Sequence, residues 1–173
     1  MEQPGLYTDS EALRLAMRRW ATGVTIVASQ HAGVRHGMTV SSFTSVSLEP
    51  PLVLVSLERT TRTHELIQRS GIFSVTILTS EQQQISDRFA GRESEMSDRF
   101  AGLEVYTLVT GAPLLQQGLA GFDCRVVNAH STGTHTIFIG DVLASRVHAN
   151  SSSRPLIYYN RGYRRLCDDG TQQ

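Results

Sequence analysis

The chain has 173 residues, 40% of them hydrophobic, which fits one domain with a full-sized core. Sixteen basic residues balance sixteen acidic ones, and a net charge of zero disfavours a nucleic-acid surface, which needs a basic excess. No apolar stretch reaches the roughly eighteen residues of a membrane span, and the acidic, polar start lacks the pattern of a secretory signal. We therefore expect a single cytoplasmic domain spanning residues 1–173.

Three short helices are predicted, over residues 9–19, 64–70 and 81–90. The first and third begin at capping boxes, in which a hydroxyl residue is followed three positions later by Glu or Gln; these pairs are Thr8 with Glu11 and Ser80 with Gln83. Thr63 is the expected cap of the second helix, and Gly71 stops it. Gly23 is expected to end the first helix.

Most other segments read as strands, because they are rich in β-branched and aromatic residues. These segments are VTIVAS, the run Leu52–Leu57, IFSVTIL, EVYTLVT, FDCRVVNAH, HTIFIGDVLASRVH and LIYYN. Pro50 and Pro51 cannot donate ladder hydrogen bonds, so they mark a strand entrance. Many strands, few helices and no regular βα alternation predict a closed antiparallel barrel.

Hydroxyl side chains are concentrated between Thr39 and Ser47, where six of nine residues carry one. A buried hydroxyl needs a hydrogen-bond partner, which is either the protein's own backbone or a polar ligand. Shortly afterwards, RTTRTHEL places Arg59, Arg62 and three threonines at the start of a predicted helix. Free N–H groups and cationic side chains at a helix start suit phosphate. The alternative is that Thr63 only caps this helix while the arginines are solvated.

Other chemistries find little support. The six histidines form no metal-binding pattern, although His130 and His135 flank a predicted turn, and we expect no metal. The GxSxG motif is absent, and Cys124 and Cys167 form neither a metal pair nor a disulfide framework. We expect two reduced thiols, with Cys124 buried in a strand.

The hexapeptide SDRFAG occurs twice, eleven residues apart, so that Phe89 and Phe100 would share a face of one continuous helix. Gly91 argues against such a helix. We interpret the repetition as a coincidence.

The order and spacing of seven stretches resemble the flavin reductase family, the small reductase components of two-component monooxygenases. The stretches are WATGVTIV from Trp20, GMTVSSFTSVSLEPPLVLVSL, the first SDRFAG, TGAPLL, LAGFDCRVV, HTIFIGDV from His135 and PLIYYNRGYRRL. The resemblance covers about residues 10–166, the expected core of the domain. It implies an antiparallel, Greek-key, FMN-binding split β-barrel and a homodimer.

The resemblance also implies the site residues. In the family, the segment matching Thr39, Val40, Ser41 and Ser42 lies along the flavin, and the phosphate end matches Ser56, Thr61, Arg62 and Thr63. Arg88 and Phe89 match a loop that contacts the cofactor. His135 matches a histidine at the nicotinamide site, here in Gly133-Thr134-His135 where the family usually has Gly-Asp-His. A strand-end histidine bonded to backbone is the alternative.

The implied reaction is hydride transfer from nicotinamide C4 to flavin N5, after which reduced flavin leaves for a separate oxygenase. The sequence leaves FMN and FAD open, and it favours NADH over NADPH only through the lack of an arginine cluster for a 2′-phosphate. Three alternatives stand beside this reading: a flavoprotein that keeps its flavin and reduces another acceptor, a non-catalytic flavin or haem carrier, and a structural dimeric barrel.

Overall fold

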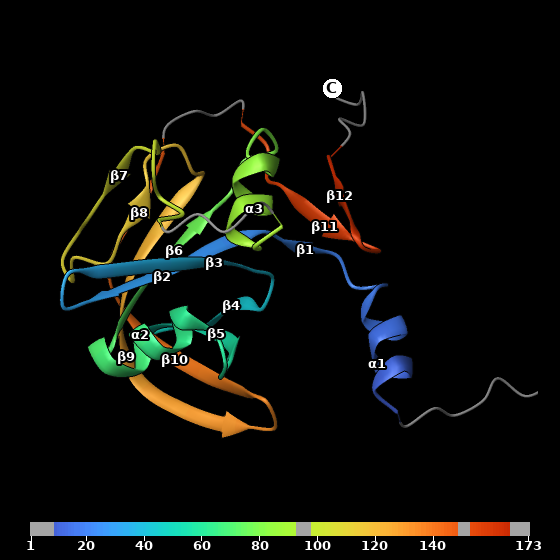
Figure 1. Ribbon diagram of the computed structural model, residues 1–173, viewed down its shortest axis with the longest axis horizontal. Coiled ribbons are helices and arrows are strands. Elements are labelled where there is room, and N and C mark those ends of the chain that lie inside the picture. Colours follow the sequence, from blue (N-terminus) through green and yellow to red (C-terminus); the bar gives the residue numbers. More distant parts are fainter. Residues whose placement is uncertain (1–8, 93–97, 149–152, 167–173) are drawn as a thin grey trace, which may run out of the picture.

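A seven-stranded antiparallel sheet dominates the computed structural model, which describes residues 9–92, 98–148 and 153–166 (Figure 1). In spatial order its strands are β3 (Val34–Val40), β2 (Thr25–His31), β6 (Ile72–Ile77), β9 (Ala120–Thr132), β10 (His135–Val147), β5 (Pro51–Glu58) and β4 (Phe43–Leu48). A small sheet joins β1 (Thr22–Gly23), β11 (Ile157–Tyr159) and β12 (Gly162–Arg164), and another pairs β7 (Val105–Tyr106) with β8 (Leu114–Leu115). The prediction of a mainly β, antiparallel fold is confirmed.

The two edge strands of the large sheet, β3 and β4, are consecutive in the chain and are joined by Ser41 and Ser42. The three peptide steps from Val40 to Phe43 span at most about 11 Å, so the sheet must curl until its edges approach each other. No ladder joins β3 to β4 in the described part of the chain, and the predicted closed barrel is therefore wrong. The link connects the two edges directly, and β3 and β4 are not paired with each other as the strands of a hairpin would be.

The curled sheet has apolar residues on both faces. One core fills its interior and is completed by Ile67 from α2 (Arg62–Ser70). A second core lies between β2 and α3 (Gln83–Phe89) and contains Phe89 and Phe100. Because β2 contributes Val27 to one core and Ile26 to the other, its sequence is continuously apolar rather than alternating.

The residues that cap the helices differ from the predicted ones. Asp9 caps α1 (Ser10–Met17) by accepting from the Ala12 N–H at 2.8 Å, while the predicted cap Thr8 lies outside the described residues. Helix α1 ends at Met17, well before Gly23. None of the three helices in the described ranges is long and apolar enough to cross a bilayer.

The caps of the other two helices also differ from the prediction. Thr61 caps α2, and the predicted cap Thr63 is already inside the helix; Gly71 ends it in the left-handed region, as expected. Helix α3 has no side-chain cap, because Gln82 uses its carbonyl oxygen to accept from the Thr79 N–H at 2.9 Å. The Ser80 hydroxyl donates to Glu81 instead.

The predicted strand over residues 104–110 is wrong beyond its first residues, since only Val105–Tyr106 pair. Both the N–H and the hydroxyl of Thr110 donate to the Asp123 carboxylate, and Gly111 follows with a φ of 85°. These bonds turn the chain away from a ladder. Cys124 is buried in β9 as predicted, and burial raises the pKa of its thiol to about 12; Cys167 lies outside the described residues.

The two SDRFAG copies contact each other. Helix α3 ends at Phe89, whose ring meets that of Phe100 edge-on at 4.9 Å. Arg99 donates to the Phe89 carbonyl at 2.8 Å, and Arg88 donates to the Ala101 carbonyl at 3.1 Å. The repeated residues therefore form a reciprocal packing unit, in keeping with the expectation that Arg99 and Phe100 of the second copy pack or bind a partner subunit.

Candidate functional site

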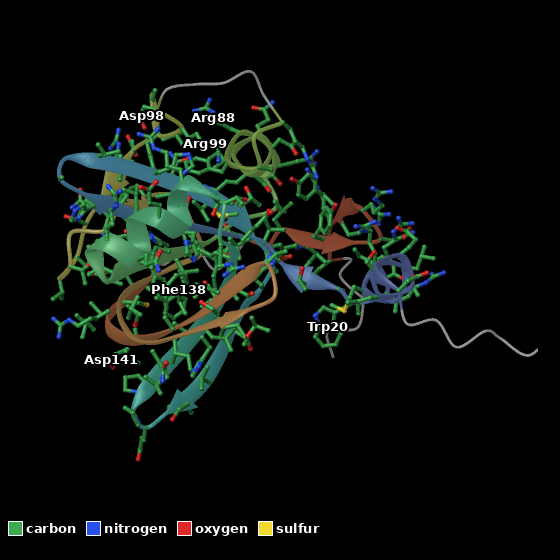
Figure 2. All side chains as sticks on the ribbon, turned by 60° about the horizontal axis from the view of Figure 1, so that its bottom comes forward. Trp20, Arg88, Asp98, Arg99, Phe138 and Asp141 are labelled. Carbon is green, nitrogen blue, oxygen red and sulfur yellow. The ribbon has the colours of Figure 1, made fainter. Side chains whose placement is uncertain are left out.

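A cavity of about 470 Å³ lies beside the Ser41–Ser42 link between the two sheet edges. Residues 20–23, just before β2, form one wall, and Thr25, Phe43, Thr44 and Ile77 complete the lining. Trp20 is 66% exposed there (Figure 2). A volume of this size with mostly apolar walls and a few hydroxyls is typical of a small-molecule site.

Most predicted hydroxyls around this link already have protein partners. Ser42 Oγ donates to the Ser56 carbonyl at 2.7 Å and accepts from the Ser56 N–H at 3.2 Å, which fixes the link to β5. Thr39 Oγ1 donates to the Ser86 carbonyl at 2.6 Å, which fixes β3 to α3. Ser41 is exposed and its hydroxyl forms no hydrogen bond within the described residues, so it is available to a ligand. Val40 is buried in the core and offers only its backbone.

The start of α2 combines free donors with positive charge. Thr61 uses its hydroxyl as cap and also donates it to the Glu58 carbonyl at 2.8 Å. Arg62 is exposed and forms no ion pair in the described part of the chain. Thr63 is fully buried, and its hydroxyl is bonded to His36 Nδ1 at 2.8 Å. Arg62 is thus exposed at a helix start that carries positive dipole character, while the Thr63 hydroxyl is turned inward to His36.

His36 is a partly buried histidine that is bonded to the start of α2 through Thr63. Burial is the largest cause that lowers its pKa to about 4, and the nearby cations Arg99 and Arg62 lower it further. The imidazole is therefore neutral at neutral pH.

His135 lies close to this helix start in space, although more than seventy residues separate them in sequence. Its partner in the β5–β10 ladder is Glu58. The preceding turn is held by Arg59, whose side chain donates to the Gly133 carbonyl at 2.8 Å. His135 itself is exposed, and its Nδ1 shares a 2.9 Å hydrogen bond with Thr134. The imidazole ring is thus accessible at the start of β10. Two residues further along this strand, Ile137 is the ladder partner of Ser56.

The predicted loop residues have a mainly structural placement. The Phe89 side chain is fully buried against Phe100, so only its backbone can reach a ligand. Arg88, Asp98 and Arg99 lie together beside α3 in Figure 2. The Arg88 guanidinium contacts the second hexapeptide through Ala101.

The structure thus brings together Ser41, Ser42, Ser56, the α2 start and His135 along one border of the curled sheet. Sequence reasoning missed Trp20 and Thr22, which line the cavity. The signal was present in the stretch WATGVTIV, to which no site role was given. No group of three or more His, Cys, Asp or Glu side chains that could hold a metal ion occurs in residues 9–92, 98–148 and 153–166.

Comparisons with known proteins give a consistent picture. Residues 17–167 match the family model described as a flavin reductase like domain. An NADH-dependent flavin reductase of Pseudomonas fluorescens is 36% identical over 156 residues, which is 90% of this chain and 89% of the relative. The reductase component of 4-hydroxyphenylacetate 3-monooxygenase of Thermus thermophilus is 36% identical over 90% of this chain and 96% of its own.

A solved structure is similar over nearly the whole fold. The NADH:FAD oxidoreductase of Streptomyces globisporus, in complex with NAD and FAD fragments, superposes with a TM-score of 0.84 at 29% identity. The superposition covers 94% of this chain and 96% of that one.

Proposed function

The chain belongs to the flavin reductase-like family and is an NAD(P)H-dependent flavin reductase, and we propose that it passes its reduced flavin to a separate oxygenase component. The observation that carries the proposal is the cavity at the Ser41–Ser42 link, where Ser42 is hydrogen-bonded to Ser56 of β5, the strand that leads into the start of α2. Relatives named as reductase components of monooxygenases support the partner. We propose NADH as the reductant, as in the relatives that are named for it.

The residues present fit a flavin. The apolar cavity with Trp20 suits the ring system, and the Ser41 hydroxyl and the backbone of the link suit its polar edge. The α2 N-terminus and Arg62 suit the phosphate. Thr39, Val40, Ser42, Thr63 and Phe89 would contribute backbone or support rather than free side chains. Ser56, Thr61 and Arg88 remain proposed flavin contacts.

The protein's own part in the reaction is binding and orientation. When bound, flavin supplies the acceptor for the hydride that nicotinamide releases. The Ser42–Ser56 hydrogen bonds hold the link, which lines the cavity, against β5. His135 is the proposed positioning residue for the nicotinamide, because it is exposed beside the α2 start. Holding both rings in contact geometry is the main source of rate in such a transfer.

We propose that the open, curled sheet is the FMN-binding split barrel and that residues 1–173 form one domain. The joining of both sheet edges through two residues supports the first proposal, and the family match over residues 17–167 supports the second. We also place the enzyme in the cytoplasm, where reduced nicotinamide is regenerated.

A homodimer is proposed because α1 buries none of its residues within its own chain. Figure 1 shows α1 beyond the small sheet, apart from the seven-stranded one. Leu13, Leu15, Met17 and Trp20 are each exposed by half or more. A net charge of zero adds little repulsion between copies.

The function is tested by steady-state oxidation of NADH and NADPH, each with FMN, FAD and riboflavin. We expect oxidation that depends on added flavin and is faster with NADH. Flavin binding without oxidation would point to a passive carrier, and no flavin binding to a structural barrel; either result contradicts the proposal. A yellow colour that survives dialysis would indicate that the flavin is retained rather than released.

The dimer predicts a single sedimenting species of about twice 19.1 kDa at micromolar concentrations. A species near 19.1 kDa over the same range would rule it out.

Arg62→Ala is expected to weaken FMN binding while leaving riboflavin binding unchanged, because riboflavin has no phosphate. A charge-assisted hydrogen bond contributes about 1.5–3 kcal/mol, which corresponds to roughly tenfold or more in the dissociation constant. Arg69→Ala is the matched control, since Arg69 lies in the last turn of the same helix and pairs with Glu65 at 2.8 Å. Equal weakening of both flavins would show that Arg62 acts through folding.

His135→Ala is expected to raise the Michaelis constant for NADH or to slow single-turnover flavin reduction, since small misplacements of a substrate are costly. The flavin dissociation constant should stay within about twofold, well under the 1.4 kcal/mol of a tenfold change. Because Glu58 is the ladder partner of His135, the flavin titration also checks for disturbance of the α2 start.

His130→Ala is the control for this substitution, since His130 lies on the other strand of the same hairpin, opposite Ile137. Equal, small effects of the two substitutions would make His135 a structural strand-end residue.

A further inference from the structure

A second cavity, of about 400 Å³, adjoins the first and shares Trp20, Thr22, Ser41 and Ser42 with it. Its remaining walls come from the end of α1 and from the turn between β11 and β12. Whatever occupies this cavity therefore lies next to the proposed flavin.

This second cavity is cationic. Its lining includes Arg14, Arg18 and Arg161 and no acidic residue. Glu11, outside the lining, pairs with Arg14 at 2.6 Å and more distantly with Arg18 at 3.8 Å. Arg161 forms no ion pair with any residue that the structure describes, and Arg18 Nε is buried without a hydrogen-bond partner there. Two guanidinium groups thus keep donor capacity for an anion.

The turn that carries Arg161 has an unusual residue for its conformation. Asn160 and Arg161 have φ values of 47° and 63°, so both central residues of this two-residue hairpin turn are in the left-handed region. Such turns favour Asn or Asp first and Gly second, because a side chain at the second position is strained. At the second position this chain has Arg161, although glycine would have a lower backbone energy there. Backbone strain of this kind is common at functional sites, which suggests a role for the Arg161 side chain.

The hairpin that carries this turn is held in place at both ends. The Asn160 N–H donates to the Arg18 carbonyl at 3.1 Å, which joins the turn to the end of α1. The Tyr163 hydroxyl donates to the Asp87 carboxylate at 2.9 Å and lies 2.8 Å from Ser86 Oγ, which joins β12 to α3. The position of Arg161 beside the Ser41–Ser42 link is therefore set by the fold.

We propose that Arg161, with Arg18, binds the pyrophosphate of a dinucleotide in this second cavity. The inference rests on the proposed function, whose two candidate dinucleotides, NADH and FAD, both contain a pyrophosphate. Trp20 and Tyr158 in the same lining supply aromatic faces on which a base or nicotinamide ring can stack. The mononucleotides FMN and reduced nicotinamide mononucleotide lack the group and would not use the subsite.

Arg161→Gly tests the proposal with little risk to folding, because glycine is the preferred residue at this φ. We expect an unchanged or higher melting temperature and, by calorimetric titration of the flavin-free protein, roughly tenfold weaker dinucleotide binding. Binding of FMN and of reduced nicotinamide mononucleotide should not change. If Arg161 had only a structural role, its substitution would not weaken the binding of dinucleotides alone while leaving the melting temperature unchanged.

The titrations separate the two sources of the pyrophosphate. Selective loss of NADH binding assigns the subsite to the reductant, and selective loss of FAD binding assigns it to the flavin. Arg161→Lys, which keeps the charge, should restore part of the lost affinity. Arg164→Ala is the matched control on the same hairpin, because Arg164 donates to the Tyr163 carbonyl and does not line the cavity.

Unchanged binding of both dinucleotides, or equal loss for dinucleotides and mononucleotides, would overturn the proposal. Failure of the wild-type protein to oxidise NADH with flavin would instead overturn the proposed function. The titrations need no turnover, so the two failures are distinguishable.

Discussion

The short link between β3 and β4 is the constraint on which the rest of the structure depends. Because these strands are the two edges of a seven-stranded sheet, Ser41 and Ser42 can join them only if the sheet curls. The curl creates an interior core, and it leaves an unpaired border where backbone groups and hydroxyls are accessible. The cavity lies at this border, so the constraint that shapes the sheet also places the site.

Hydroxyl groups around the link mostly fix neighbouring elements to it. Ser42 holds β5, Thr39 holds α3 through the Ser86 carbonyl, and Thr63 holds β3 through His36. The bonds of Thr39 and Thr63 also satisfy polar groups that would otherwise be costly at partly or fully buried positions, whereas Ser42 is exposed. Two of the six hydroxyl residues between Thr39 and Ser47, namely Thr39 and Ser42, are thus explained by positioning, and the Ser41 hydroxyl remains for the ligand.

The sequence predicted element types well, because periodicity and β-branched runs reflect burial directly. It placed the helix over 64–70 close to α2, but it assigned the cap to Thr63 rather than Thr61. Thr61 and Thr63 both suit a helix cap by local sequence. The long-range hydrogen bond to His36 determines that the Thr63 hydroxyl turns inward. Phe89 was assigned to the cofactor from the family resemblance, which did not reveal that its ring packs against Phe100. Arg161 carried a visible signal, an arginine after asparagine in a tight hairpin, which acquires meaning only beside the cavity.

Helix α1 links the proposed subsite to the proposed dimer. Its eight residues are too few for a stable isolated helix, and none of them is buried within the chain. Nevertheless α1 leads directly into Arg18 and Trp20, two walls of the second cavity. Contacts that bury Leu13 and Met17 against another copy would therefore also order Arg18 and Trp20. In this arrangement, association of two chains and organisation of the anion subsite are stabilised by the same helix.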